Sequence, residues 1–437
     1  MTRAVLKIGG GILRSREDLE TIVKILKMNS GRENILVVSA LSGVTDTLLG
    51  AYAHSKDVSA ELRRKHQAYF DVQNEALDAK FKELSKLLSE KKKSVERKER
   101  VSAFGERLSA IAVAEYLNAH GIPALAMDAE ECGIAADGRF EKANCVLEKT
   151  KENFKTRVIP KIAGKTLVIT GYYGIDGNGN VNTFGRGGSD YSAAVVAVAS
   201  SAQVLEIWKD VEGFMSADPR VVKDARKLDE ISFDEAKELG YLGAKILHPR
   251  TMDALRGSKV FAQIKSVLAP EMPGTRIVEE RTRKTGKIIT SIAAKKGTCV
   301  VNIRGAEMVD VPGVAAQIFT AIAKKGVSID TIATSQVNIT FTIDENDAET
   351  AEKALRAMPH LVGDFEMSRG LAVVGVVGDE MNVPNTAARI FAAVGRRRIN
   401  ISMISQAALG INVTLIVKRE DADECIRAIH EEFVLGE

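Results

Sequence analysis

The first part of the chain alternates short apolar runs with segments of helical spacing. Residues 5–9 and 35–39 have the continuous apolar pattern of short buried strands. The segment 18–28 between them has helical spacing, with one apolar face formed by Leu19, Ile22, Val23 and Leu26. Further strand-like runs at 167–170 and 204–208 are separated by helical stretches, including the alanine-rich segment 191–202. This alternation predicts an α/β fold, with a mainly parallel sheet sandwiched by helices.

Two stretches depart from this alternation and indicate how the chain is divided. Residues 57–100 are helical in pattern and highly charged, which predicts a helical insertion on the surface of the sheet. Residues 279–287 are charged and poorly patterned, so we expect a linker there. The sequence therefore predicts a first domain over residues 1–285 and a second region over residues 286–437.

The second region contains an approximate internal repeat. One copy begins Val-Asp-Val-Pro-Gly-Val-Ala-Ala at residue 309, and the other begins Asn-Val-Pro-Asn-Thr-Ala-Ala at residue 382. In each copy a helical segment is followed by two strand-like segments, 327–332 and 337–343 or 399–404 and 411–417. This order predicts a small ferredoxin-like α/β sandwich used twice. Such sheets have exposed edges, which favours pairing with a further strand.

Composition and charge exclude several classes of protein. Hydrophobic residues make up 45% of the chain and charged residues 27%, and the net charge is only +3, which favours neither nucleic-acid binding nor a membrane-surface role. There is no apolar run of about 18 residues that would span a membrane, and the N-terminus enters an apolar strand without a cleavage signal. The four cysteines are scattered without metal-ligand spacing, so we expect reduced thiols and a cytoplasmic location.

Glycine-rich segments provide two candidate anion sites. Lys7 precedes Gly9, Gly10 and Gly11, where backbone amides can approach an oxyanion and the lysine can neutralise a phosphate; a plain tight turn is the alternative. Arg186 lies in a second segment, Gly185-Arg186-Gly187-Gly188-Ser189-Asp190, just before the alanine-rich helix. A cap by Ser189 or Asp190 would explain the two polar residues but not the arginine. We therefore favour a loop that binds a carboxylate or phosphate.

Five other segments hold candidate polar residues. Lys209 and Asp210 end a strand, which is typical of a nucleotide-binding edge, although an Asx turn is the alternative. Glu106 lies at the start of a helix, where it either binds an amine or complements the helix dipole. Lys245, taken alone, is expected to be an ordinary surface lysine. The remaining candidates are the hydroxyl-rich loop 39–45 and the segment Asp218-Pro219-Arg220.

Taken together, these motifs resemble the aspartokinase family over nearly the whole chain, and the paired repeats resemble ACT regulatory domains. The most specific matches are residues 104–109, 185–192, 218–220 and 243–250. The resemblance implies an amino-acid-kinase fold followed by two ferredoxin-like ACT domains. It also implies transfer of the ATP γ-phosphate to the β-carboxylate of L-aspartate with Mg²⁺, the first step of lysine, threonine and methionine synthesis.

The same resemblance implies roles for individual residues. The catalytic residues would be Lys7, Lys245 and Asp190. The substrate would be bound by Ser39, Thr45, Glu106, Arg186, Gly187, Gly188 and Ser189. The nucleotide would be bound by Lys7, Gly9, Gly10, Gly11, Lys209, Asp210, Arg220 and Lys245. An effector, lysine or threonine, would be bound by Val314, Ala315, Ser335, Gln336, Asn338, Gln406 and Asn412. A homodimer or higher oligomer would form through the ACT domains.

Some positions depart from the family pattern. Gly11 and Ile12 replace two hydroxyl residues of the usual Lys-Phe-Gly-Gly-Thr-Ser, and Lys209 replaces the threonine of the usual Trp-Thr-Asp. The regulatory repeats have fewer polar groups than the family's usual Gln-Gly-Ser-Ser-Glu segment, which leaves dimerisation as an alternative role. Two alternative functions remain open at this point: a kinase of another carboxylate, and a catalytically impaired amino-acid sensor.

Overall fold

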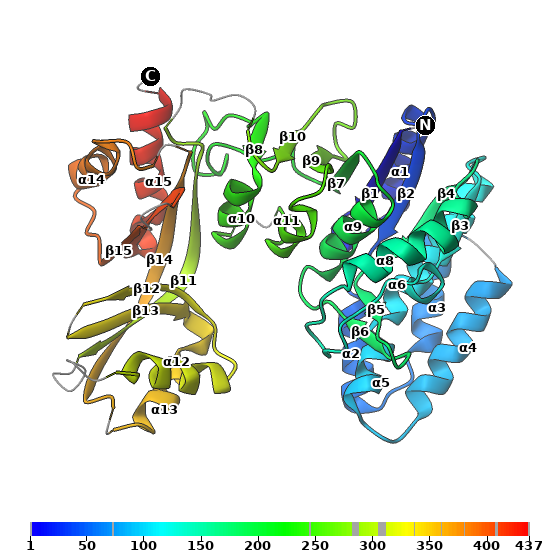
Figure 1. Ribbon diagram of the computed structural model, residues 1–437, viewed down its shortest axis with the longest axis horizontal. Coiled ribbons are helices and arrows are strands. Elements are labelled where there is room, and N and C mark those ends of the chain that lie inside the picture. Colours follow the sequence, from blue (N-terminus) through cyan, green and yellow to red (C-terminus); the bar gives the residue numbers. More distant parts are fainter. Residues whose placement is uncertain are drawn as a thin grey trace. The chain divides into compact units, whose positions relative to one another are not determined.

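The computed structural model describes residues 2–71, 74–243, 246–281, 288–304, 312–335, 337–359, 361–379, 381–406 and 410–435 (Figure 1). The chain forms two compact units. The first comprises Met1–Phe214, Asp229–Lys237 and Lys245–Arg281, and the second comprises Met215–Leu228, Glu238–Ala244 and Thr282–Glu437. Six residues of the predicted linker, 282–287, lie outside the described residues. No helix of the described segments is long and apolar enough to cross a membrane.

The first unit is built on an eight-stranded sheet in the order β3-β4-β2-β1-β7-β9-β10-β8. Its strands are β1 (Arg3–Ile8), β2 (Glu33–Val38), β3 (Ala124–Met127), β4 (Thr166–Thr170), β7 (Val204–Lys209), β8 (Glu230–Ser232), β9 (Phe261–Ser266) and β10 (Thr275–Val278). The strands from β3 to β9 are parallel, and β10 runs antiparallel to β9. Both predicted features, a mainly parallel sheet and short apolar strands, are confirmed.

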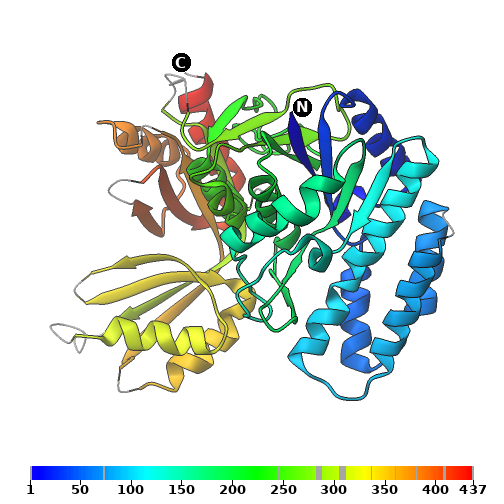
Figure 2. The ribbon, with the colours of Figure 1, turned by 45° about the vertical axis from the view of Figure 1, so that its right-hand side comes forward.

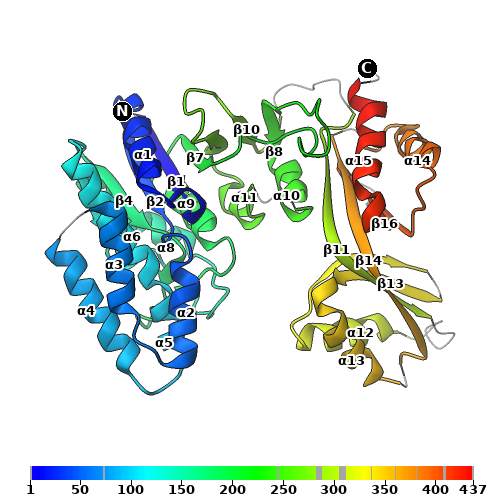
Figure 3. The ribbon, with the colours of Figure 1, turned by 180° about the vertical axis from the view of Figure 1, so that it is seen from behind.

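Helices cover both faces of this sheet. Leu6, Leu36 and Val168 belong to one apolar cluster with α1 (Arg16–Met28) and α6 (Phe104–Ala119). The opposite face is covered by α9 (Gly188–Ala199), which contacts β1, β2 and β7. Figure 1 shows α9 in front of the sheet, and Figure 3 shows α1 from behind. Successive side chains of a strand point to opposite faces, so each strand contributes alternate residues to the two cores.

The remaining elements of the first unit include the predicted helical segment. Residues 57–100 form α3 (Ser59–Phe70), α4 (Glu75–Ser89) and most of α5 (Val95–Ser102). These helices lie side by side, as Figure 2 shows in blue and cyan, and their apolar residues join the cluster below α6. The other elements are α2 (Val44–His54), α7 (Ala129–Cys132), α8 (Leu147–Asn153), α11 (Arg250–Leu255) and the two-stranded β5 (Tyr173–Ile175) and β6 (Val181–Thr183). Helix α10 spans Phe233–Tyr241.

The second unit contains one six-stranded antiparallel sheet in the order β12-β13-β11-β14-β16-β15. The first repeat comprises β11 (Ser291–Arg304), α12 (Val314–Lys324), β12 (Ile329–Thr334), β13 (Asn338–Asp344) and α13 (Ala348–Arg356). The second comprises β14 (Asp364–Val377), α14 (Thr386–Arg396), β15 (Met403–Gln406), β16 (Asn412–Lys418) and α15 (Ala422–His430). The predicted repeat is therefore confirmed at the level of its elements.

The two repeats are joined through their long first strands. Residues 298–304 of β11 pair with β13 of the first repeat, whereas residues 371–377 of β14 pair with β16 of the second. The two long strands also pair with each other along most of their length. Each repeat thus supplies an edge strand to the other, which satisfies the exposed edges expected of a small sheet.

Two segments from the middle of the chain belong to the second unit. Ser216 accepts a backbone hydrogen bond from Ile292 at 2.9 Å, and its hydroxyl lies 3.0 Å from the imidazole of His430. Leu242 packs on Gly375, where an added Cβ would lie 2.0 Å from a leucine methyl group. The sequence pattern did not indicate this packing, because residues 215–228 and 238–244 precede the predicted linker.

Candidate active site

The strand register places several predicted residues in one row at the carboxyl ends of the strands. Lys7 is paired with Val37 on one side and with Ile207 on the other. Side chains two residues apart on a strand point to the same face, so Ser39 and Lys209 lie on the face of Lys7, one step further along. This is the face that α9 covers. Ligands of parallel α/β sheets bind at the carboxyl ends of the strands.

Lys7 and Asp190 form an ion pair at the centre of this row. The Lys7 Nζ lies 2.6 Å from Asp190 Oδ1, and both side chains are buried. Burial alone would raise the pKa of Asp190, but the charges of Lys7 and then Lys209 outweigh it and hold this pKa below its ordinary value. Burial also lowers the pKa of Lys209. Asp190 is therefore paired with Lys7 directly, whereas Lys209 acts on it from further away.

The first glycine segment forms a short turn above Lys7. A Cβ at position 9 would lie 2.6 Å from Lys7 Nζ, and one at position 10 would lie 2.9 Å from the carbonyl oxygen of Ala40. Position 11 has no atom within 4 Å of an added Cβ. Close packing against the backbone therefore requires Gly10, whereas Gly11 is open. At Gly9 the nearest atom is the lysine Nζ, so the turn leaves this ammonium directly beside the bare backbone.

The second glycine segment begins α9 without a side-chain cap. The N-cap residue is Gly187, with φ of 71° and no side-chain hydrogen bond to the helix. The alternative interpretation, a cap by Ser189 or Asp190, is therefore wrong, because Asp190 is directed to Lys7 instead. An added Cβ at Gly187 would lie 2.3 Å from the ring of His248, so the imidazole packs directly against this turn.

Arg186 extends from this loop and is exposed. Among the described residues no carboxylate lies within ion-pair distance of its guanidinium. Gly188 must lack a side chain, because a Cβ there would lie 2.9 Å from the ring of Tyr172. Ser189, next in the loop, is half-buried and packs against Gly171, where an added Cβ would lie 3.0 Å from the serine Cβ. The loop is thus tightly packed at Gly188 and Ser189, and it carries the exposed guanidinium of Arg186 without a paired acid among the described residues.

Glu106 is a buried carboxylate in the first turn of α6. It is only 3% exposed, and its Oε2 has no hydrogen-bond partner among the described residues. Burial raises the pKa of Glu106 to about 8, and it is opposed by a hydrogen bond from the backbone of Ala40 and by the charge of Lys7. A helix-dipole contact alone does not require burial, so the environment is better suited to the first interpretation, a binding group for an amine.

The other predicted substrate and nucleotide residues are distributed as follows. Ser39 is half-buried at the end of β2, where its backbone donates to Ile8 at 3.0 Å, and Thr45 is half-buried in the first turn of α2. Asp210 is exposed and its carboxylate lies 3.5 Å from Arg14. Arg220 belongs to the second unit, where it forms an exposed ion pair with Asp218 at 2.7 Å. Lys245 lies outside the described residues.

The predicted effector residues lie in the second unit. In the first repeat, Val314 is buried at the start of α12, Ala315 follows it, and Ser335 and Asn338 are joined by a backbone hydrogen bond of 2.9 Å. In the second, Gln406 lies 3.4 Å from Asn382 and Asn412 donates to Glu238. Gln336 lies outside the described residues. Several of these polar groups are thus already engaged within the unit.

Sequence reasoning did not single out His248 and Tyr172. His248 packs on Gly187, and burial lowers its pKa although Asp190 opposes this. It belongs to the motif 243–250, in which a role is predicted from the sequence only for the lysine. Tyr172 has φ of 76°, a conformation that is uncommon outside glycine, and nothing in the sequence indicates it. Both residues support the loop that precedes α9.

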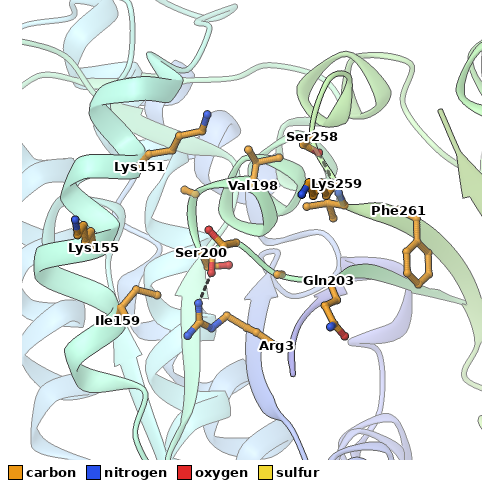
Figure 4. Close-up of a pocket in the computed structure, with 14 residues that line it drawn as sticks. Arg3, Lys151, Lys155, Ile159, Val198, Ser200, Gln203, Ser258, Lys259 and Phe261 are labelled. Atoms are coloured by element: carbon orange, nitrogen blue, oxygen red, sulfur yellow. Dashed lines mark hydrogen bonds between the residues drawn. The ribbon is translucent and has the colours of Figure 1, made fainter. Parts of the chain in front are cut away.

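A cavity of about 960 Å³ lies elsewhere in the first unit (Figure 4). It lies at the amino ends of the strands, because its lining includes Arg3 at the start of β1, Gln203 just before β7 and Phe261 at the start of β9. Figure 4 shows Arg3 directed toward Ser200, with which it forms a hydrogen bond. None of the predicted site residues lines this cavity, so it is separate from the row around Lys7.

Comparison with known proteins adds independent information. The amino acid kinase family matches residues 2–266, and the ACT domain matches residues 301–358 and 374–433. Aspartokinase 1 of Arabidopsis thaliana, a chloroplastic protein, is 29% identical over 98% of this chain and 80% of its own length. The aspartokinase of Thermus thermophilus is 30% identical over 100% of this chain and 99% of its own length.

A solved structure shows the same fold. Aspartokinase III of E. coli, crystallised with lysine and aspartate, has a TM-score of 0.86 to this chain and is 24% identical to it. The likeness covers 98% of this chain and 99% of that one. The kinase sheet and the paired ACT repeats therefore occur together in both.

Proposed function

Since this chain belongs to the aspartokinases of the amino acid kinase family, we propose the division of tasks among its residues that follows from the site. The enzyme transfers the γ-phosphate of ATP to the side-chain carboxylate of L-aspartate and forms 4-phospho-L-aspartate, the first step of lysine, threonine and methionine synthesis. A different carboxylate substrate or a catalytically impaired sensor is not favoured.

One observation supports the residue assignment most strongly: Lys7, which is paired with buried Asp190, acts electrostatically on the buried carboxylate of Glu106, whose Oε2 has no hydrogen-bond partner among the described residues. Aspartate carries two carboxylates and one ammonium, so a site that binds it needs cations near the carboxylates and a buried anion near the ammonium. Glu106 would bind the ammonium of aspartate, and Arg186 would bind a carboxylate of the substrate. Ser39, Thr45, Gly187, Gly188 and Ser189 would supply hydroxyl and backbone contacts.

Lys7 would act on the transferring phosphoryl group. A carboxylate is ionised near neutral pH and is already a nucleophile, so the reaction needs no strong base. Catalysis then depends on positioning and on stabilisation of the charge of the transition state. Asp190 would hold the Lys7 ammonium in place. Lys245 is proposed from the sequence alone as a second cation on the same group.

The nucleotide would lie along the glycine turn. Backbone amides at Gly9, Gly10 and Gly11 would face its phosphates, and Lys209 and Asp210 end the neighbouring strand. We retain Arg220 as a nucleotide contact on the strength of its sequence motif only. The change of Gly11 and Ile12 from hydroxyl residues removes two donors near the phosphates.

Mg²⁺ would enter with ATP. The described segments contain no group of three or more His, Cys, Asp or Glu side chains that could hold a metal ion. Mg²⁺ commonly keeps several waters and binds through phosphates with one or two carboxylates, so the residues present fit an ion that arrives as Mg·ATP. When bound, it would neutralise phosphate charge, while Lys7 and its neighbours hold the phosphoryl group.

The ACT repeats would provide regulation and assembly. Because lysine is present in the E. coli structure, we propose an amino-acid effector, lysine or threonine, at the residues assigned above. We also propose a homodimer or higher oligomer formed through these repeats. The four cysteines are unpaired, which fits the reducing cytoplasm that we propose as the location.

A coupled assay of ADP release tests this assignment. Mg·ATP with L-aspartate should give turnover, whereas N-acetyl-L-aspartate, which lacks the ammonium that Glu106 would bind, and L-glutamate should give little. Arg186→Ala should raise the KM for aspartate at least tenfold and leave the KM for ATP nearly unchanged. Turnover with N-acetyl-L-aspartate as fast as with aspartate would contradict the role of Glu106, and an unchanged KM in Arg186→Ala would contradict that of Arg186.

A further inference from the structure

The ion pair at the centre of the site leaves a deficit of positive charge. Lys7 Nζ is 2.6 Å from Asp190 Oδ1, and both side chains are buried. At this separation the two unit charges largely cancel in their effect on a third group. The transferring phosphoryl group is strongly anionic, and it approaches a second anion, the carboxylate of the acceptor. Lys7 with Asp190 alone therefore provides little net charge for it.

Lys209 supplies a cation at the right place in the fold. It is the last residue of β7, and its side chain lies on the face of Lys7 because Ile207, two residues earlier, is paired with Lys7. Its carbonyl oxygen accepts a hydrogen bond from Val267 at 2.8 Å, which fixes the strand end. Its backbone follows directly on the pairing of Ile8 with Trp208, so it is the neighbour of the glycine turn.

The ammonium of Lys209 is not consumed by a carboxylate. Within the described parts of the chain no acid lies within ion-pair distance of its Nζ, although Asp190 and Asp210 act on it from further away. Burial and the charge of Lys7 lower the pKa of Lys209. A partly buried ammonium without a paired anion is costly, and an incoming phosphate would relieve that cost. A purely structural role, as a distant counter-ion of Asp190, would not require the strand-end position next to the glycine turn.

We propose that Lys209 contacts the γ-phosphoryl group during transfer and provides the net positive charge that the Lys7–Asp190 pair does not. This deepens the proposed function and rests on it. In the step concerned, a carboxylate oxygen of aspartate forms a bond to the γ-phosphorus while the bond from this phosphorus to the bridging oxygen breaks. The electron pair of the broken bond stays on the β-phosphate of ADP, and no proton moves.

Substitutions of Lys209 test the proposal against a matched control. Lys209→Met removes the charge and keeps the length of the side chain, and Lys209→Arg keeps the charge. Lys265→Met is the control. Lys265 lies on the adjacent strand β9 and is paired with Trp208 of β7, so its side chain faces the side of the sheet opposite to Lys209. Its Nζ lies 5.1 Å from the centre of the indole ring of Trp208. Folding of each variant is checked by its thermal midpoint.

Removal of one preorganised charge contact lowers turnover by about 100-fold, and this is the loss we expect in kcat for Lys209→Met. The KM for ATP should change less than threefold, Lys209→Arg should recover at least a tenth of the wild-type kcat, and Lys265→Met should resemble wild type. A normal kcat in folded Lys209→Met, or an equal loss in Lys209→Arg, overturns the proposal.

A binding measurement separates this proposal from the identity of the acceptor. ADP with Mg²⁺ and aluminium fluoride mimics the phosphoryl group in transit, and its affinity can be measured by calorimetry without turnover. Lys209→Met should weaken this complex at least tenfold and leave the affinity for ADP alone unchanged. Equal weakening of both places Lys209 on ADP itself and overturns the proposal. If wild type instead fails with aspartate but binds the aluminium fluoride complex through Lys209, the proposed acceptor fails and the role of Lys209 stands.

Discussion

The pH dependence of aspartate binding follows from the burial of Glu106. Its carboxyl is 3% exposed, and burial raises its pKa from 4.5 to about 8. In the proposed site the ionised form of Glu106 binds the ammonium of aspartate, so substrate binding would first have to remove this proton. With a pKa of about 8, roughly one Glu106 side chain in ten is ionised at pH 7. Each further pH unit below 7 lowers the ionised fraction about tenfold, which corresponds to about 1.4 kcal/mol of binding free energy.

The expected result is a KM for aspartate that falls about tenfold from pH 6 to pH 7 and levels off above pH 8. Binding at pH 7 should also release roughly 0.9 proton per aspartate. Calorimetry in buffers with different heats of ionisation measures this release directly. Glu106→Gln should bind aspartate weakly at every pH and release no proton. The control is Glu115→Gln on the same helix, which should retain the pH profile of wild type.

The same group affects stability with a definite sign. The pKa of Glu106 is raised in the folded state, so its contribution to stability is fully present below pH 4.5 and is lost as the pH rises through about 8. The enzyme without substrate should therefore lose thermal stability from pH 6 to pH 9, and Glu106→Gln should lose less. A KM that is constant from pH 6 to pH 9, together with no proton release, would refute the reasoning.

Three further predictions concern the packing and charge of the two units. Lys7→Met should lower kcat by about 10²- to 10³-fold, measured by ADP release, with a smaller effect on nucleotide affinity; an equal loss of both would mean that the lysine acts in ground-state binding. Gly10→Ala should reduce activity at least tenfold more than Gly11→Ala, because a Cβ at position 10 would lie 2.9 Å from a backbone carbonyl and one at position 11 meets nothing within 4 Å; equal losses would contradict this geometry. Gly375→Val should lower the free energy of unfolding of the second unit by about 1–3 kcal/mol, measured by calorimetry. Adding Leu242→Ala to the same chain should restore part of this lost stability, and a double variant whose loss equals the sum of the two single losses would exclude the contact.

Much of the fold was predictable because its signals are local. The apolar runs at residues 5–9 and 204–208 contain enough hydrophobic side chains to indicate buried strands, and they are β1 and β7. The alternation of strands and helices then predicts a parallel sheet. The packing of residues 215–228 and 238–244 into the second unit was not predictable, because it depends on contacts such as Ser216 with His430, which are 214 residues apart.

The candidate site was predictable only as a set of residue types. Lys7 and Asp190 could each be named from their motifs, but their pairing depends on the register of β1 against its neighbours and on the angle at which α9 begins. Asp190 illustrates the difficulty, since its sequence context equally suits a helix cap. Burial is also a property of the tertiary structure, so the buried carboxylate of Glu106 could not be anticipated from a first-turn glutamate.

The charges of the site follow from the chemistry of two anionic substrates. A nucleotide and a dicarboxylate repel each other, and a site that brings them together must offer more cations than anions near the phosphoryl group. Asp190 at first contradicts this requirement, because it neutralises the lysine closest to the glycine turn. Its effect is to fix that lysine and to act on Lys209 from a distance. Glu106 is the other buried acid of the site, and its raised pKa means that it gains its charge most readily when the ammonium of the acceptor is present to balance it.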